Sequence, residues 1–207
     1  MNYEFPEALL IQFAKAPQLG QVKTRMQPVL SVEQSLALHR QLVQRTHQTL
    51  HREALCRSQL WISGADNDGF FHSLKPLPDI KHQHGDDLGE RMHLAIAAGL
   101  DHKRVVVLIG SDCPAISSDY LRTALCALNR VDVVLGPAAD GGYVLIAMKK
   151  ADRAVFSDVD WSTPRVLQQT RARLRASKLS CFELPVLNDI DRPEDLIYLD
   201  LLPPLQQ

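Results

Sequence analysis

Residues 105–109 form the clearest hydrophobic run in the chain, with five consecutive apolar side chains of which three are valine. A run without polar alternation predicts a strand buried on both faces, as in the middle of a parallel sheet with helices on either side. Gly110 and Ser111 end the run, and Pro114 cannot donate to a strand ladder. Asp112 is therefore predicted just beyond the carboxyl end of a central strand. In open α/β sheets, that edge is where ligands bind.

Apolar runs of strand length alternate along the chain with segments of helical periodicity. Ser31 and Gln34 fit a capping box at the start of one helix, and Pro164 is tolerated in the first turn of another. A Gly-rich segment at 140–142 is short enough to join two antiparallel strands. The predicted strands are 9–14, 59–63, 80–83, 105–109, 131–136, 143–148 and 180–184. The predicted helices are 31–50, 88–100, 117–128, 163–177 and a short one from Pro193.

This alternation of strands and helices predicts an α/β fold: a three-layer α/β/α sandwich around a mostly parallel, mixed sheet. A length of 207 residues is enough for one such domain and short for two. No internal repeat, linker or low-complexity segment divides the chain. We therefore expect a single domain over residues 1–207.

Composition and charge narrow the range of partners. The formal net charge is −1, which argues against nucleic acids and anionic membranes as ligands. No apolar run approaches the roughly 20 residues that span a bilayer. The first four residues lack the basic segment of a signal peptide, so a cytoplasmic protein is expected. The four cysteines are scattered and form no CxxC pair, which favours free thiols over disulfides or a zinc site.

Acidic side chains follow two of the predicted strands. The carboxylate of Asp112 is a candidate ligand for Mg²⁺ or Mn²⁺, because hard divalent cations prefer oxygen donors. A turn-capping role is the alternative for this residue. Asp189 and Asp191 lie two residues apart beyond the last strand, and in extended backbone such side chains point the same way, so both could face one cation. They could equally cap the helix that begins near Pro193.

Three cations, Lys15, Lys23 and Arg25, lie on the loop after the first predicted strand. They suit a phosphorylated ligand, since arginine offers bidentate contacts and lysine a point charge. A solvated loop is the alternative. The chain has no GxxxxGK[ST] motif and no GxGxxG after its first strand, which excludes an ordinary P-loop and a dinucleotide-binding loop.

A further polar group precedes the predicted strand 143–148. The paired glycines Gly141 and Gly142 let the backbone approach a ligand closely, and Asp140 and Tyr143 could hydrogen-bond a sugar hydroxyl. An ordinary turn explains the glycines equally well. Trp161 lies in a loop that enters a helix, where it could stack on a sugar ring or a base, or pack into the core.

Six motifs combine these residues in one order along nearly the whole chain, from about residue 9 to 200. They are 13–25, 83–91, 109–114, 136–143, 161–164 and 189–195. Each motif alone is weak, but the ordered set is highly specific. In these motifs the chain resembles the uncharacterised bacterial DUF2064 family, a branch of the GT-A (nucleotide-diphospho-sugar transferase) superfamily.

The resemblance implies a Rossmann-like GT-A sheet that binds a nucleoside phosphate and a divalent cation at the carboxyl ends of its strands. By similarity, the loop from Lys15 to Arg25 would hold phosphates. Asp112 would match the metal-binding aspartate of the superfamily. Asp191, with Asp189 as its partner, would match the later acidic position.

The function expected from this resemblance is a Mg²⁺- or Mn²⁺-dependent transferase with a nucleotide-sugar donor and a small-molecule acceptor. Asp112 would act in catalysis by holding the cation, and Asp140 by deprotonating the acceptor. Gly141, Gly142, Tyr143 and Trp161 would contact substrate. One alternative is a nucleotidyltransferase that moves a guanylyl or cytidylyl group from an NTP to a small phosphorylated acceptor; another is a non-catalytic nucleotide-binding regulatory protein. The base, the acceptor and a homodimeric assembly are left open.

Overall fold

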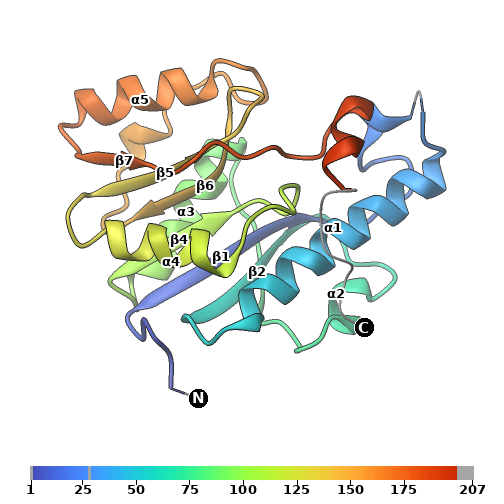
Figure 1. Cartoon of the computed structure of the whole chain (residues 1–207), viewed down its shortest axis with the longest axis horizontal. Helices are drawn as coiled ribbons and strands as arrows, with labels where there is room; N and C mark the ends of the chain where they lie inside the picture. Colours follow the sequence, from blue (N-terminus) through green and yellow to red (C-terminus); the bar gives the residue numbers. More distant parts are fainter. Residues whose placement is uncertain (1, 28, 200–207) are drawn as a thin grey trace.

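The computed structural model describes residues 2–27 and 29–199. In them a seven-stranded sheet has the order β3-β2-β1-β4-β6-β5-β7 (Figure 1). β6 is antiparallel to both of its neighbours, and every other pairing is parallel. The strands are β1 (Ala8–Lys15), β2 (Arg57–Ser63), β3 (Ile80–His82), β4 (Val105–Ile109), β5 (Val133–Pro137), β6 (Tyr143–Met148) and β7 (Cys181–Glu183).

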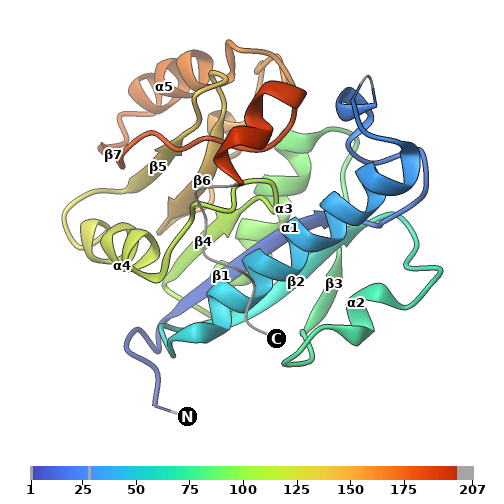
Figure 2. The same ribbon diagram turned by 45° about the vertical axis from the view of Figure 1, so that its right-hand side comes forward.

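Helices cover both faces of this sheet (Figure 2). On one face, Leu10 and Val107 belong to a core that includes residues of α1 (Val32–Arg52) and α4 (Ser118–Ala127). On the other face, their sequence neighbours belong to a second core with residues of α3 (Leu88–Leu100) and α5 (Val166–Ala176). Successive side chains of a strand point to opposite faces, so both faces of the central strands are apolar. The predicted three-layer sandwich with a mixed, mostly parallel sheet is confirmed.

Local signals placed several elements correctly. The capping box of α1 is formed: Ser31 Oγ accepts from Gln34 N at 3.2 Å, and Gln34 Oε1 accepts from Ser31 N at 2.8 Å. The prediction for the start of α5 is wrong by three residues. Thr163 and Pro164 form a turn before the helix, because Thr163 Oγ1 accepts the N–H of Arg165 at 3.3 Å and the Thr163 carbonyl accepts that of Val166 at 3.3 Å.

Short helical segments were not predicted, because one turn is too short to display a helical period. They are η1 (Thr24–Met26), α2 (Phe70–Ser73) and η2 (Arg153–Val155). The expected helix near Pro193 is present as the 3₁₀ segment η3 (Pro193–Tyr198). The side chain of Met26, just past the cationic loop, is buried in an apolar cluster with Leu38, Leu42 and Ile190, and this cluster links η1, α1 and the segment before η3.

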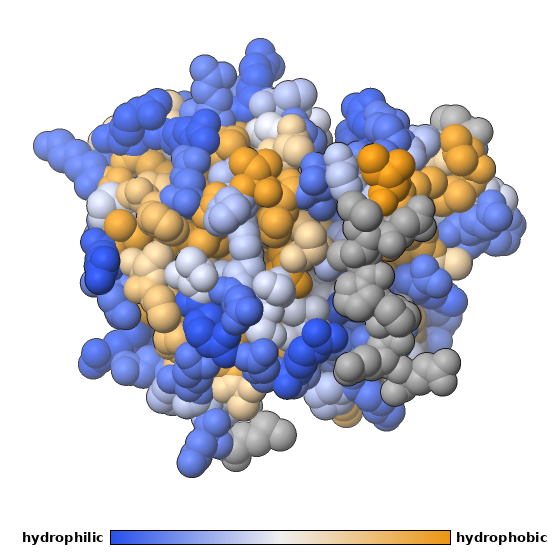
Figure 3. Space-filling view, in the orientation of Figure 1, coloured by the Kyte–Doolittle hydropathy of each residue, from blue (hydrophilic) through white to orange (hydrophobic). Residues whose placement is uncertain are grey.

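Figure 3 shows apolar patches on an otherwise hydrophilic surface, in the orientation of Figure 1. The patches lie mainly over β5, β7 and η3. Phe182, Val186 and Ile197 are among the exposed large hydrophobic residues. The edge strand β7 has only three residues, and a short edge limits pairing with other chains. No helix in residues 2–27 and 29–199 combines the length and the apolar character that a bilayer crossing requires.

The order of the strands creates a switch point between β1 and β4. From β1 the chain adds β2 and β3 outward on one side, and β4 then pairs with the other side of β1. In open α/β sheets, ligands bind in the crevice at the carboxyl ends of the strands where the order reverses. Lys15 ends β1 at this point, and Gly110 to Asp112 follow β4.

Candidate active site

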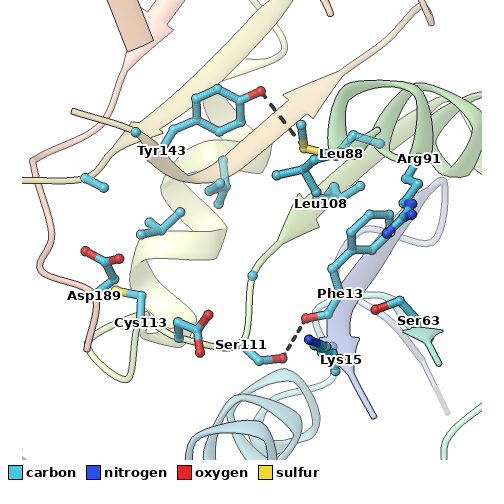
Figure 4. Close-up of a pocket in the computed structure, with 18 of the residues that line it drawn as sticks. Phe13, Lys15, Ser63, Leu88, Arg91, Leu108, Ser111, Cys113, Tyr143 and Asp189 are labelled. Carbon is cyan, nitrogen blue, oxygen red and sulfur yellow. Dashed lines mark hydrogen bonds between the residues drawn. The ribbon is translucent and has the colours of Figure 1, made fainter. Parts of the chain in front are cut away.

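A cavity of about 370 Å³ opens at the switch point. Its size is within the range of small-molecule sites. Figure 4 shows Asp189 and Cys113 on one side of it and Lys15, Ser63 and Arg91 on the other. Acidic groups therefore face cationic ones across the space in which a ligand would lie. Among the predicted site residues, the lining includes Lys15, Asp112, Asp140, Gly142, Tyr143 and Asp189.

Asp112 is held at the acidic side by Lys23. The Lys23 ammonium lies 2.5 Å from Asp112 Oδ1, and it also donates to the carbonyl of Ile190 at 2.5 Å. The Lys23 side chain is 3% exposed, whereas that of Asp112 is 50% exposed and so keeps one side open to the cavity. Lys23 also adopts φ 50°, a left-handed conformation that is uncommon for lysine. Lys23 therefore serves as the resident counter-ion of Asp112.

The peptide of Ile190 joins the two acidic segments of the site. Its N–H donates to the carbonyl of Asp112 at 2.8 Å, and its side chain is fully buried. Asp189 and Asp191 flank this anchored residue. Asp189 lines the cavity that also contains Asp112, whereas Asp191 pairs with Arg25 at 2.5 Å.

Asp189 is in an unfavourable environment for a charged carboxylate. Burial first, and then repulsion from Asp140, Asp112 and Asp191, raise the pKa of Asp189 from 3.8 to about 6. Asp189 has no ion-pair partner within residues 2–27 and 29–199. A cation bound beside it would relieve this repulsion, because an opposite charge favours the ionised form.

A second cavity, of about 390 Å³, adjoins the first. Asp140 and Asp189 line both cavities. Arg25 and Asp191 line only the second. The cationic loop is thus divided: Lys15 faces the first cavity, Arg25 the second, and Lys23 is paired beneath Asp112.

The Gly-Gly turn has a structural reason of its own. Gly141 has φ 91°, and a Cβ added there would lie 2.2 Å from the carbonyl oxygen of Pro164. Asp140 Oδ1 accepts the N–H of Gly142 at 2.8 Å, which fixes one oxygen of this carboxylate. Gly141 therefore fits the turn against the loop before α5, and Gly142 is the glycine that lines the first cavity.

The two aromatic candidates lie differently from each other. Tyr143 lines the first cavity, but its hydroxyl faces Met92 Sδ at 4.0 Å, and burial raises its pKa (Figure 4). Trp161 packs over Gly89 of α3 and meets the Tyr143 ring edge-on, with 6.4 Å between the ring centroids. Trp161 lines neither cavity. Its contacts match the core-packing alternative.

Comparison of the sequence with curated proteins found no match. The sequence pattern of the DUF2064 family, described as an uncharacterized protein conserved in bacteria, matches residues 24–163. The chain belongs to this family.

Several solved structures of other proteins are similar to this DUF2064 chain. A protein from Desulfovibrio desulfuricans G20, provisionally named a nucleotide-diphospho-sugar transferase, is 34% identical over 94% of this chain and 87% of its own, with a TM-score of 0.87. Two others share the fold at a TM-score of 0.60. CMP:2-keto-3-deoxy-manno-octonic acid synthetase complexed with CTP is 11% identical over 94% and 97% of the two chains. Rv0371C from Mycobacterium tuberculosis H37Rv, in complex with manganese, is 14% identical over 93% and 97%.

The predicted family and fold are confirmed. The prediction of a nucleotide-utilising transferase agrees with the name of the first structure. In this DUF2064 chain, several residues that line the first cavity were not predicted from the sequence as site residues. They are His39, Ser63, Gln83 and Arg91. Arg91 is the most informative of them. It belongs to the motif 83–91, lines the first cavity and forms no ion pair with any residue in 2–27 or 29–199.

A buried polar network supports the cavity from below. Gln12, 1% exposed within β1, donates through Nε2 to Ser111 Oγ and to the carbonyl of Val43, both at 3.0 Å. Ser111 Oγ in turn donates to the carbonyl of Phe13 at 2.7 Å. The signal for this network was present in the sequence, because a glutamine inside an otherwise apolar strand must find partners.

The acidic residues fit a divalent cation that is shared with a ligand. Within the described residues, no group of three Asp, Glu, His or Cys side chains could hold a metal ion without help. Mg²⁺ needs no such group, since in nucleotide enzymes it is bound by one or two carboxylates together with substrate phosphates. Asp112 and Asp189 line the same cavity and supply the oxygen donors for this arrangement.

Proposed function

We propose that this chain is a divalent-metal-dependent transferase that uses a nucleotide-sugar donor. The observation that carries the proposal is the division of the switch-point cavity. Asp189 lies on one side of it, with Asp112 close enough to repel the Asp189 carboxylate, and Lys15 and Arg91 lie on the other side. A nucleoside diphosphate carries negative charge that suits the cationic side. Asp112 and Asp189 would hold a divalent cation, which would add positive charge near the phosphates.

Lys15 and Arg91 are proposed to bind the phosphates of the donor. Arg91 is half-buried, and its Nε donates to the carbonyl of Gly85 at 3.0 Å, which leaves the terminal nitrogens available for a bidentate contact. The Lys15 ammonium donates to the carbonyl of Gln21 at 2.8 Å and supplies a point charge. Both groups would stabilise negative charge on the departing nucleoside diphosphate.

Asp112 and Asp189 are proposed to hold Mg²⁺ or Mn²⁺, with Asp191 as the outer acidic residue. When bound, the ion supplies further neutralisation of charge on the phosphates. Lys23 positions the Asp112 carboxylate through their ion pair. Asp140 lies where the two cavities meet. Its Oδ1 accepts the N–H of Gly142, and its Oδ2, which has no hydrogen-bond donor among residues 2–27 and 29–199, would accept the proton. It is therefore the candidate base for the acceptor.

The proposal is tested by calorimetric titration of nucleoside diphosphates and nucleotide-sugars, with Mn²⁺ or with EDTA. We expect at least one to bind in a metal-dependent manner. Asp112→Asn should weaken that binding about tenfold or more, in line with the loss of a charge-assisted contact. The control is Asp119→Asn, because the Asp119 side chain is 91% exposed on α4, pairs with Arg122 and lines neither cavity. Metal-independent binding, or binding that Asp112→Asn leaves intact, contradicts the proposal.

A nucleotidyl transfer is the second candidate, favoured by the shared fold of a synthetase that was solved with CTP. The products separate the two reactions. Release of a nucleoside diphosphate from a nucleotide-sugar supports glycosyl transfer, whereas release of pyrophosphate from an NTP supports nucleotidyl transfer. Metal-dependent nucleotide binding without either product supports the non-catalytic alternative.

A further inference from the structure

The second cavity has a charge that restricts what it can bind. It is lined by five carboxylates and two guanidinium groups, which gives a formal charge of −3. The carboxylates are those of Asp140, Asp189, Asp191, Glu194 and Asp195, and the guanidinium groups those of Arg25 and Arg192.

Internal contacts already use part of this charge. Arg25 is paired with Asp191 at 2.5 Å. Asp195 accepts the N–H groups of Asp191 at 3.0 Å and Arg192 at 2.7 Å, so its carboxylate is committed to the backbone before η3. Asp189 is committed to the proposed cation, so the acidic groups left to face an acceptor are Asp140 and Glu194, against the single guanidinium of Arg192.

We infer that this second cavity binds the acceptor and that the acceptor is an uncharged polyhydroxylated molecule. The inference rests on the proposed transferase function and adds the chemical class of its second substrate. Phosphorylated acceptors bring their own negative charge into a space with an acidic excess, where like charges repel. Hydroxyl groups, in contrast, donate hydrogen bonds to carboxylates. Ser162, Thr163 and Asn188 add neutral polar groups to the same lining.

The arrangement of the two cavities suits a direct transfer. Asp140 borders both, so a hydroxyl of the acceptor and the reacting carbon of the donor sugar can meet beside its carboxylate. The acceptor oxygen forms a bond to that carbon, and the bond from the carbon to the phosphate oxygen breaks. The proton of the hydroxyl passes to Asp140, and the electron pair leaves with the nucleoside diphosphate. This step needs no other co-reactant.

The test uses matched neutral and phosphorylated probes: glucose and glucose 6-phosphate, myo-inositol and its 1-phosphate, glycerol and its 3-phosphate. Saturation-transfer NMR reports which of them contacts the full-length protein. We expect contact from at least one neutral probe and much weaker contact from its phosphorylated counterpart. Asn188→Trp should abolish the neutral signal by filling the cavity. Contact from the phosphorylated probes at equal strength, or from no neutral probe, overturns the inference.

A charge reversal tests the electrostatic reason separately. Glu194→Arg adds a cation to the lining and should raise the affinity for the phosphorylated probe at least about fivefold, a modest electrostatic effect for an exposed site. Glu7→Arg is the control, because Glu7 is paired with Arg104 before β1 and lines neither cavity. An equal effect of both variants contradicts a role of this cavity. Metal-dependent nucleotide binding is measured alongside: if it persists while the probes fail, the inference fails alone.

Discussion

Asp189→Asn is expected to stabilise the protein while weakening its binding of a divalent cation. Burial and three neighbouring carboxylates raise the pKa of Asp189 from 3.8 to about 6. At neutral pH the ionised carboxylate therefore costs the folded state up to about 3 kcal/mol relative to the unfolded chain. Asp189 is partly exposed, and solvent screening reduces this to about 1–2 kcal/mol. Asparagine keeps the shape and removes the charge.

The sign of the pH dependence follows from the raised pKa. The folded state binds the Asp189 proton more tightly than the unfolded state does. Protonation of Asp189 therefore stabilises the folded state relative to the unfolded state. This stabilisation is fully present below the ordinary pKa of 3.8, and it is lost as the pH rises through about 6. The gain from Asp189→Asn should therefore be largest above pH 6 and should diminish as the pH falls toward 3.8.

Urea unfolding in EDTA, at a pH of about 8 and of about 5, measures this gain. Asp191→Asn is the matched control, the same substitution two residues away. It removes the ion pair with Arg25 but also relieves some repulsion of Asp189, so a change below about 1 kcal/mol is expected. Calorimetry should show Mn²⁺ binding weakened about tenfold or more in Asp189→Asn, since a carboxylate ligand is lost. A gain of the same size at both pH values, or no gain at the higher one, refutes the reasoning.

Three further substitutions test other parts of the site. Lys23→Met should tighten binding of Mn²⁺ alone about tenfold, because the ion no longer competes with the ammonium beside Asp112; weaker binding in calorimetry contradicts this. Gly141→Ala should lower the free energy of unfolding by about 2–4 kcal/mol, against less than about 1 for Gly142→Ala, since only the former has a positive φ and meets a backbone oxygen. Arg91→Gln should weaken nucleotide binding about tenfold, with partial recovery in Arg91→Lys; unchanged affinity would remove Arg91 from the phosphate site.

Most of the sheet could be predicted because its signals are local. The apolar run of β4 and the capping box of α1 each lie within a few residues, and both are present as expected. The same apolar pattern placed Asp112 beyond a strand end, which gave the correct edge of the sheet for the cavity. Single-turn segments such as α2 and η2 lack a period long enough to recognise, so they were missed.

Pairings within the site could not be predicted, because they join segments far apart in the chain. No local pattern indicates that Lys23 would be buried beneath Asp112, or that Arg91 would line the same cavity as Asp112. Both depend on tertiary packing: Met26 of η1 packs with α1 and Ile190, and Met92 of α3 belongs to the same core as Phe13 and Leu108. Gln12 was a usable signal, because a buried amide in a strand requires partners and these lie at the base of the site.

The separation of Asp189 from Asp191 shows where a local rule needs the tertiary structure. The rule that side chains at i and i+2 point the same way applies to regular strands. Residues 188–191 belong to no strand, although an isolated bridge at Leu187 and the hydrogen bond from Ile190 N to Asp112 O anchor the segment. With Ile190 buried, Asp189 lines the first cavity beside Asp112, and Asp191 instead pairs with Arg25 in the second. Asp189 thus reaches the cavity of Asp112, which Asp191 does not. Substitution of Asp189 should therefore weaken binding of the metal and the donor, whereas substitution of Asp191 should act only on the second cavity, through the loss of its pair with Arg25.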